Sequence, residues 1–116
     1  MKKTLFVDID GCLIKHRGNL SEQMFGDVEV LPGVLEKLNE WNIKEYKIIL
    51  ATGRPESTRE LTERQLQCAG IFYDQLIMGL GRGERIIIND RKPTGSEAVA
   101  SGIEVMRNEG LGDVKV

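Results

Sequence analysis

Three aspartates stand directly after apolar stretches of this sequence, and their type and spacing suit phosphate chemistry. Asp8 and Asp10 follow the first stretch, and Asp90 follows a later one. A continuing strand would point Asp8 and Asp10 to opposite sides, but Gly11 allows the chain to turn so that both carboxylates reach one cavity. A few oxygen ligands suit Mg²⁺, which keeps several waters and often completes its shell with substrate phosphate. A carboxylate beside such an ion can attack phosphorus, because the metal shields it from the phosphoryl oxygens.

Apolar, β-branched runs are expected to position these groups as buried strands. The runs cover residues 4–7, 46–51 and 85–88. Each run ends in polar residues, as is typical of a strand that is buried on both faces. Helices with one apolar face are expected between them, at residues 34–41 and 55–68. This alternation predicts an α/β fold with a mostly parallel sheet, in which ligands lie beyond the carboxyl ends of the strands.

Two segments outside these elements carry weaker patterns. Residues 13–30 have turn-like sequences without a helical period, so we expect a loop or hairpin that projects over the site. The tail after Pro93 contains only a short candidate strand at residues 103–106. The site is therefore expected between the strand ends and the 13–30 loop.

Length and composition indicate a single domain over residues 1–116. A chain of 116 residues, 41% of them hydrophobic, is long enough for one domain with one buried core and too short for two domains of ordinary size. Lys and Arg number 16 against 18 Asp and Glu, so the net charge of −2 gives no electrostatic footprint for nucleic acid or an anionic membrane. No signal peptide is visible, the apolar runs are far below the roughly 20 residues that span a bilayer, and Cys12 and Cys68 form no Cys-x-x-Cys pair. We expect a cytoplasmic protein with reduced thiols and no membrane contact.

Three motifs resemble those of the haloacid dehalogenase (HAD) superfamily. They are residues 8–13 (DIDGCL), 49–54 (ILATGR) and 87–91 (IINDR). One Asp-x-Asp segment alone carries little weight, because such segments are common at turns, whereas three motifs in the expected order at three strand ends carry much more. The resemblance spans residues 4–93 and implies a Rossmann-like three-layer sandwich of the minimal type, without a cap domain.

The resemblance also implies roles for the matching residues. Asp8 would form an aspartyl-phosphate, and Asp10 would protonate the leaving group and then activate water. Thr52 and the amide groups of Gly53 and Arg54 would hold the phosphoryl oxygens near a helix start. The activity implied is Mg²⁺-dependent hydrolysis of a phosphate monoester.

A metal site and a catalytic cation complete the implied machinery. Asp8, Asp10 and Asp90 would bind Mg²⁺, with Asp10 donating its backbone carbonyl. The superfamily also needs a cation, usually a lysine, to neutralise the nucleophile and the phosphate. Arg82 stands eight residues before Asp90, where some members place that lysine, and Lys92 is its rival. An arginine would hold oxygens by a planar fork rather than by a compact charge.

Other functions stay open on the sequence alone. A non-catalytic phosphate-binding or regulatory subunit is suggested by Arg82 in place of lysine and by Asn89, where many members have glycine or a second aspartate. A receiver-type phosphoacceptor module fits less well, because its acceptor aspartate would end a middle strand, where Thr52 stands. An enzyme without a cap could act on a sugar phosphate or a nucleotide, on a phosphorylated nucleic-acid end, or within a homo-oligomer whose subunits cover each other's sites.

Overall fold

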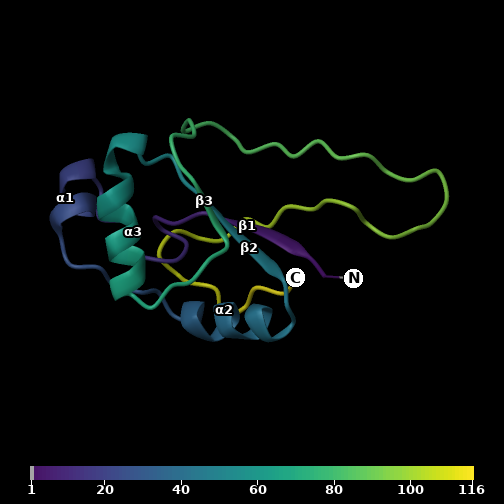
Figure 1. Ribbon diagram of the computed structural model, residues 1–116, viewed down its shortest axis with the longest axis horizontal. Coiled ribbons are helices and arrows are strands. Elements are labelled where there is room, and N and C mark those ends of the chain that lie inside the picture. The colour runs from purple at the N-terminus through teal and green to yellow at the C-terminus, as the bar shows by residue number, and fades with distance from the viewer. Residues whose placement is uncertain (1) are drawn as a thin grey trace.

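Three short strands form a parallel sheet at the centre of the computed structural model, which describes residues 2–116 (Figure 1). The order is β1-β2-β3, with β1 at Thr4–Val7, β2 at Lys47–Ala51 and β3 at Gln75–Ile77. The register places Val7 beside Leu50 and Leu50 beside Leu76. Asp8 and Thr52, which follow β1 and β2, therefore lie at the same edge of the sheet, as the sequence predicts.

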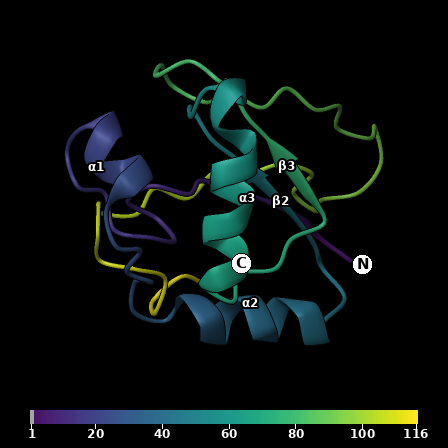
Figure 2. The same ribbon diagram turned by 60° about the vertical axis from the view of Figure 1, so that its left-hand side comes forward.

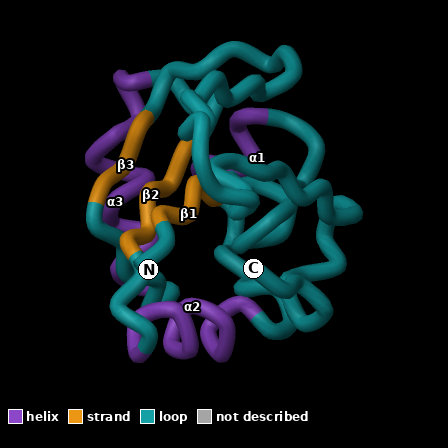
Figure 3. Tube along the Cα trace, turned by 90° about the vertical axis from the view of Figure 1, so that its right-hand side faces the viewer, coloured by secondary structure: helices purple, strands orange, loops and turns teal. Residues whose placement is uncertain are grey.

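Helices pack against this sheet and its flanking loops. They are α1 at Leu20–Phe25, α2 at Val34–Ile43 and α3 at Arg59–Cys68, with a 3₁₀ turn (η1) at Glu56–Thr58 before α3. In Figures 1 and 2, α3 lies beside the sheet next to α1, and α2 runs below it. In Figure 3 the strands follow one another as β3, β2 and β1, and beyond β1 most of the chain is loop. The predicted α/β fold with a parallel sheet is confirmed.

One hydrophobic core joins the strands, the helices and the loop after β1. Its fully buried members include Ile9, Leu13, Val34, Leu38, Ile48, Leu50 and Leu66. The apolar spacing that predicts α2 places Val34, Leu38 and Trp41 on its buried face. Because Ile9 is completely buried, the acidic residues on either side of it start from a well-defined position. Among the helices of residues 2–116, none combines the length and apolar character needed to cross a membrane.

The strand predicted at residues 85–88 is wrong. This part of the chain belongs to an extended loop that leaves the sheet after β3 and returns to the C-terminal tail (Figure 1). Ile86, Ile87 and Ile88 are 73%, 53% and 94% exposed. A β-branched run favours a pleated, half-buried surface, but it becomes a strand only where another strand edge pairs with it, and here no described strand does. The third strand is β3, which the sequence pattern does not predict.

Residues 13–30 and the tail also differ from the expectations. The 13–30 segment contains the short helix α1, which Asn19 caps by accepting a hydrogen bond from a first-turn backbone N–H at 2.8 Å. In the described tail, residues 103–106 form no strand. Leu111 anchors the tail instead, since it is 2% exposed and its N–H donates to the Pro32 carbonyl at 2.9 Å.

Ile48 and Ile88 form a matched pair for testing this arrangement. Ile48 is 1% exposed in β2, and Ile88 is 94% exposed in the extended loop. Ile48→Ala should lower the free energy of unfolding by about 2–5 kcal/mol, because it leaves a cavity in the core. Ile88→Ala should change it by less than about 0.5 kcal/mol. Urea unfolding measures both values, and a loss of similar size at Ile88 would show that this side chain is buried in solution.

Candidate active site

The loop after β1 turns sharply and presents Asp8 and Asp10 at the carboxyl end of the sheet. Gly11 has a φ of 87°, in the left-handed region that favours glycine. Its N–H donates to the Ile14 carbonyl at 2.7 Å, and the N–H of Ile14 donates to the Ile9 carbonyl at 3.2 Å. The turn predicted from Gly11 is therefore present directly after the second aspartate.

A buried ion pair holds Asp10. Nε of Arg54 donates to Oδ2 of Asp10 at 2.8 Å, and Nη2 donates to Oδ1 at 2.7 Å. The Arg54 side chain is 2% exposed and the Asp10 side chain 17%. Nη1 of Arg54 donates to Oγ1 of Thr62 at 3.0 Å and to Oε1 of Gln65 at 2.7 Å. The planar guanidinium suits this two-point contact with a carboxylate, and α3 sets its direction.

Helix α1 supplies a second partner for Asp10. Nε2 of Gln23 donates to Oδ1 of Asp10 at 2.7 Å and to the Lys15 carbonyl at 2.9 Å. Nε2 of Gln65 donates in turn to the carbonyls of Gln23 and Met24, at 3.2 and 3.0 Å. An ionised carboxylate has about four acceptor sites. Arg54 and Gln23 fill three of them at Asp10, which leaves one site on Oδ2 for a proton or a substrate atom.

Asp8 has a different environment from Asp10. Its side chain keeps a side open to solvent, yet enough protein surrounds it that burial raises the pKa of Asp8 above its ordinary value of 3.8. The backbone N–H of Ile9 opposes this rise in pKa, the charge of Asp10 adds to it, and the charges of Arg85 and His16 oppose it. Two neighbouring carboxylates in unlike environments allow one to attack while the other carries protons.

Residues 52–54 differ in part from their expected roles. Thr52 is 2% exposed, and its Oγ1 accepts a hydrogen bond from the backbone N–H of Arg54 at 3.1 Å. The Arg54 amide is thus already occupied, which corrects its expected contact with phosphate, and the Arg54 side chain is committed to Asp10. Gly53 is exposed at the same edge, where an added Cβ would lie 3.1 Å from the Leu80 carbonyl oxygen.

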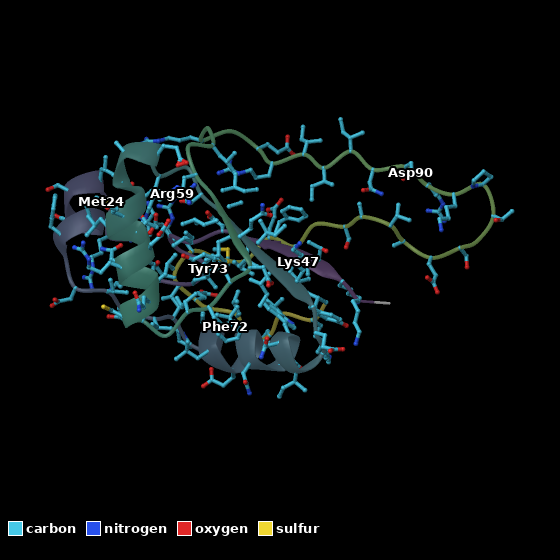
Figure 4. The ribbon with its side chains drawn as sticks, viewed as in Figure 1. Met24, Lys47, Arg59, Phe72, Tyr73 and Asp90 are labelled. Carbon is cyan, nitrogen blue, oxygen red and sulfur yellow. The ribbon has the colours of Figure 1, made fainter. Side chains whose placement is uncertain are left out.

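The structure does not bring Asp90, Arg82 or Lys92 to the two aspartates. All three are exposed on the extended loop, and Figure 4 shows Asp90 far out on it. Within residues 2–116, no group of three His, Cys, Asp or Glu side chains is arranged to hold a metal ion. The physical reason is the missing strand at residues 85–88, because no strand pairing carries Asp90 to the edge where Asp8 lies.

Asp8 and the turn after it still offer oxygens that suit Mg²⁺. The Asp8 carboxylate is open to solvent, and none of the backbone hydrogen bonds in this described turn ends on the Asp10 carbonyl. Because Mg²⁺ is commonly held by one or two carboxylates with waters and substrate phosphate, these two oxygens fit it as donors. The Asp10 carboxylate adds little as a metal donor, since Arg54 and Gln23 occupy it.

Two side chains at this site leave no signal in the sequence. Gln23 lies in a segment with turn-like residues, and no pattern there indicates that its amide reaches Asp10. The cation on this loop whose charge lowers the pKa of Asp8 is Arg85, and not the expected Arg82 or Lys92. Its Nη1 donates to two backbone carbonyls of its own loop, both at 2.7 Å. Its place at the start of the β-branched run predicts only a strand residue.

Cys12 lies beside the aspartates but is not suited to be a nucleophile. Burial raises the pKa of Cys12 to about 11, and the charge of Asp8 adds to this rise. The thiol is therefore protonated near neutral pH. Cys12 packs against the hydrophobic core, and both it and Cys68 are free thiols.

Solved structures share this fold over much of the chain. One chain of the Pnkp1/Rnl/Hen1 complex is 31% identical, over 67% of this chain and 28% of that chain, with a TM-score of 0.59. A chain of the Pnkp1/Rnl/Hen1 RNA repair complex is 30% identical, over 72% of this chain and 27% of that chain, with a TM-score of 0.58. This protein therefore spans about a quarter of the length of these chains.

A more distant likeness concerns the fold alone. A Vibrio cholerae protein is 21% identical over 73% of this chain and 79% of its own, with a TM-score of 0.57. No protein-family model and no curated protein sequence matches this chain.

Arg54→Lys should destabilise the protein although it keeps the positive charge. An ammonium cannot reach both Asp10 oxygens and the acceptors on α3 together, so we expect the free energy of unfolding to fall by at least about 2 kcal/mol. Arg59→Lys is the matched control, because Arg59 pairs with Glu56 at the surface, with side chains 37% and 59% exposed. The control should lose less than about 1 kcal/mol in urea unfolding. An equal loss of unfolding free energy in the two variants would contradict a special role for the two-point contact between Arg54 and Asp10.

Asp8→Asn should raise the thermal unfolding midpoint at pH 7. The pKa of Asp8 in the folded protein lies above its ordinary value of 3.8, so ionisation of Asp8 is harder in the folded than in the unfolded protein. Ionisation therefore lowers the free energy of unfolding at pH values above the folded-state pKa. It has no effect at pH values at which Asp8 is protonated in both states. The gain in midpoint should therefore shrink as the pH falls and vanish near pH 3. Calorimetric scans of both proteins from pH 7 to pH 3 measure this, and a gain that is independent of pH would contradict it.

Proposed function

We propose that this protein is a phosphohydrolase of the haloacid dehalogenase superfamily that hydrolyses a phosphate monoester, with Asp8 as nucleophile and Asp10 as general acid and base. The observation that carries the proposal is the aspartate pair at the carboxyl end of β1, with Asp8 open to solvent and Asp10 held by Arg54. The likeness to chains of the Pnkp1/Rnl/Hen1 complexes, at 30% and 31% identity over part of their length, supports the family.

The reaction proceeds in two steps on the two aspartates. An oxygen of Asp8 attacks phosphorus while the bond from phosphorus to the leaving oxygen breaks, and a proton on Oδ2 of Asp10 passes to that oxygen. Water then attacks the phosphorus of the aspartyl-phosphate, gives its proton to Asp10 and breaks the bond to Asp8. Inorganic phosphate leaves, and both aspartates return to their starting states. Arg54 keeps the Asp10 carboxyl in one orientation throughout.

Asp8 and the Asp10 carbonyl would hold Mg²⁺, which when bound shields the attacking carboxylate from the phosphoryl oxygens. Asp90 would join this donor set only if its loop folded back toward β1. The positive charge of Arg85 already acts on Asp8, and it would partly neutralise the nucleophile and the incoming phosphate in place of Arg82.

The phosphoryl oxygens would be held at the end of β2. Gly53 is exposed at this edge, and its N–H is a candidate donor. The hydroxyl of Thr52 retains its own proton for donation while it accepts from Arg54. Both groups can hydrogen-bond to oxygens whose charge grows during the reaction. Lys92 would contribute only from a rearranged loop.

The leaving group belongs to one of two classes. The net charge of −2 favours a small metabolite such as a sugar phosphate or a nucleotide. The likeness to a chain of an RNA repair complex favours a phosphorylated nucleic-acid end. Turnover of sugar phosphates, nucleotides and oligonucleotides with a 3′- or 5′-phosphate, each compared at equal concentration, distinguishes these classes.

A second candidate function is non-catalytic phosphate binding, favoured by the position of Asp90 far out on the extended loop (Figure 4). In that case calorimetry would detect phosphate binding while no phosphate ester on the panel is hydrolysed. Release of inorganic phosphate with Mg²⁺ would exclude this alternative.

Asp8→Asn should reduce the Mg²⁺-dependent release of phosphate by at least about a hundredfold, because an amide cannot serve as the nucleophile. Asp27→Asn is the control, since Asp27 is exposed in the loop after α1 and should keep full activity. A colorimetric phosphate assay at pH 7 measures both variants. If Asp8→Asn keeps more than about a tenth of the activity, the nucleophile is another group.

A further inference from the structure

The C-terminal tail contacts the loop that carries the aspartates. Oδ1 of Asn108 accepts a hydrogen bond from the N–H of His16 at 2.7 Å, and Nδ2 of Asn108 donates to the His16 carbonyl at 3.1 Å. The backbone N–H of Asn108 donates to the Gly11 carbonyl at 2.8 Å. One residue from the far end of the chain thus contacts both ends of the loop from Gly11 to His16.

The side chain of Asn108 imitates a neighbouring strand. Its amide offers one acceptor and one donor to the same residue, His16, as a paired backbone would. Asn108 itself has a φ of 66°, and asparagine is among the few residues other than glycine that adopt this left-handed conformation readily. The residue type therefore suits both the turn in the tail and the contact with the loop.

The tail is held firmly on its other side. Leu111 is buried, and its N–H donates to the Pro32 carbonyl, two residues before α2 begins. A Cβ at Gly110 would overlap the Pro32 carbonyl, so only glycine allows this close contact. The tail consequently connects the loop from Gly11 to His16 with the residues just before α2, a helix that packs in the hydrophobic core.

The contact of Asn108 acts next to Asp10. Gly11 follows Asp10 directly, and the stem of Arg107 covers Gly11, since a Cβ there would lie 3.1 Å from Cγ of Arg107. Arg54 and Gln23 hold the Asp10 side chain, and the tail holds the next residue, Gly11, by a backbone hydrogen bond. Movement of the loop would shift the carboxyl of Asp10 relative to Asp8.

We propose that Asn108 is a positioning residue for phosphoryl transfer, which holds the loop after Asp10 so that the acid and the nucleophile keep their productive spacing. This inference rests on the proposed function. Asn108 touches neither aspartate side chain, and it acts through Gly11 and His16. Small displacements of a catalytic group cost large factors in rate, so a residue of this kind affects turnover more than substrate binding.

Asn108→Gly is the informative variant, because glycine keeps the left-handed backbone and removes only the side chain. Turnover (kcat) of an aryl phosphate in the presence of Mg²⁺ should fall by about ten- to a hundredfold while KM changes less than about twofold. Amide hydrogen exchange at His16, followed by NMR, should become about tenfold faster because its acceptor is lost. Glu45→Gly is the matched control, since Glu45 has a φ of 61° and is exposed far along the chain from this loop. It should leave kcat and the His16 exchange rate unchanged.

Asn108→Asp keeps an acceptor for the His16 N–H and a residue that tolerates the left-handed conformation, so it provides a second variant if Asn108→Gly does not fold. Its kcat should lie between those of the native protein and Asn108→Gly. An unchanged kcat in an active, folded Asn108 variant would overturn the inference while leaving the proposed function intact, whatever the exchange rate at His16. Absence of turnover in the native protein would instead overturn the proposed function, and the inference with it.

Discussion

The buried ion pair between Arg54 and Asp10 is the interaction on which the rest of the site depends. Burying two charges costs several kcal/mol for each ion, and their attraction offsets this cost only when the remaining donors and acceptors are satisfied. Arg54 meets this condition through Thr62 and Gln65, polar residues of α3 that are 0% and 8% exposed. Among the described residues, no buried side-chain nitrogen or oxygen lacks a partner. The end of β2, the loop after β1 and α3 are therefore positioned together.

This constraint also separates the chemistry of the two aspartates. Asp10 is oriented by an arginine fork and a glutamine amide, so its free acceptor site has one direction. Asp8 stands one residue beyond β1 with an open side and a raised pKa. Ile9, which is completely buried between them, anchors this segment in the hydrophobic core. Two carboxylates with unlike surroundings thus arise from one three-residue segment.

In the extended loop, the local sequence pattern and the tertiary structure disagree. The β-branched residues at 86–88 have the composition of a buried strand, yet they remain exposed. Their side chains favour a pleated surface, but strand formation also requires a partner whose unpaired backbone groups lie in reach. β3 has a weaker pattern and forms because it pairs with β2, Leu50 lying beside Leu76. The placement of Asp90, Arg82 and Lys92 follows from this one difference.

The amino-acid sequence by itself determined β1, β2, α2 and the turn at Gly11, because each depends on neighbouring residues. Apolar spacing and glycine's backbone freedom act over a few positions and leave a visible pattern. Only the tertiary structure decided the partners of Asp10 and the contact of Asn108 with the same loop. The Arg54–Asp10 pair joins residues 44 positions apart, and the His16–Asn108 pair joins residues 92 apart. Contacts over such distances arise from the packing of whole elements, which no local periodicity records.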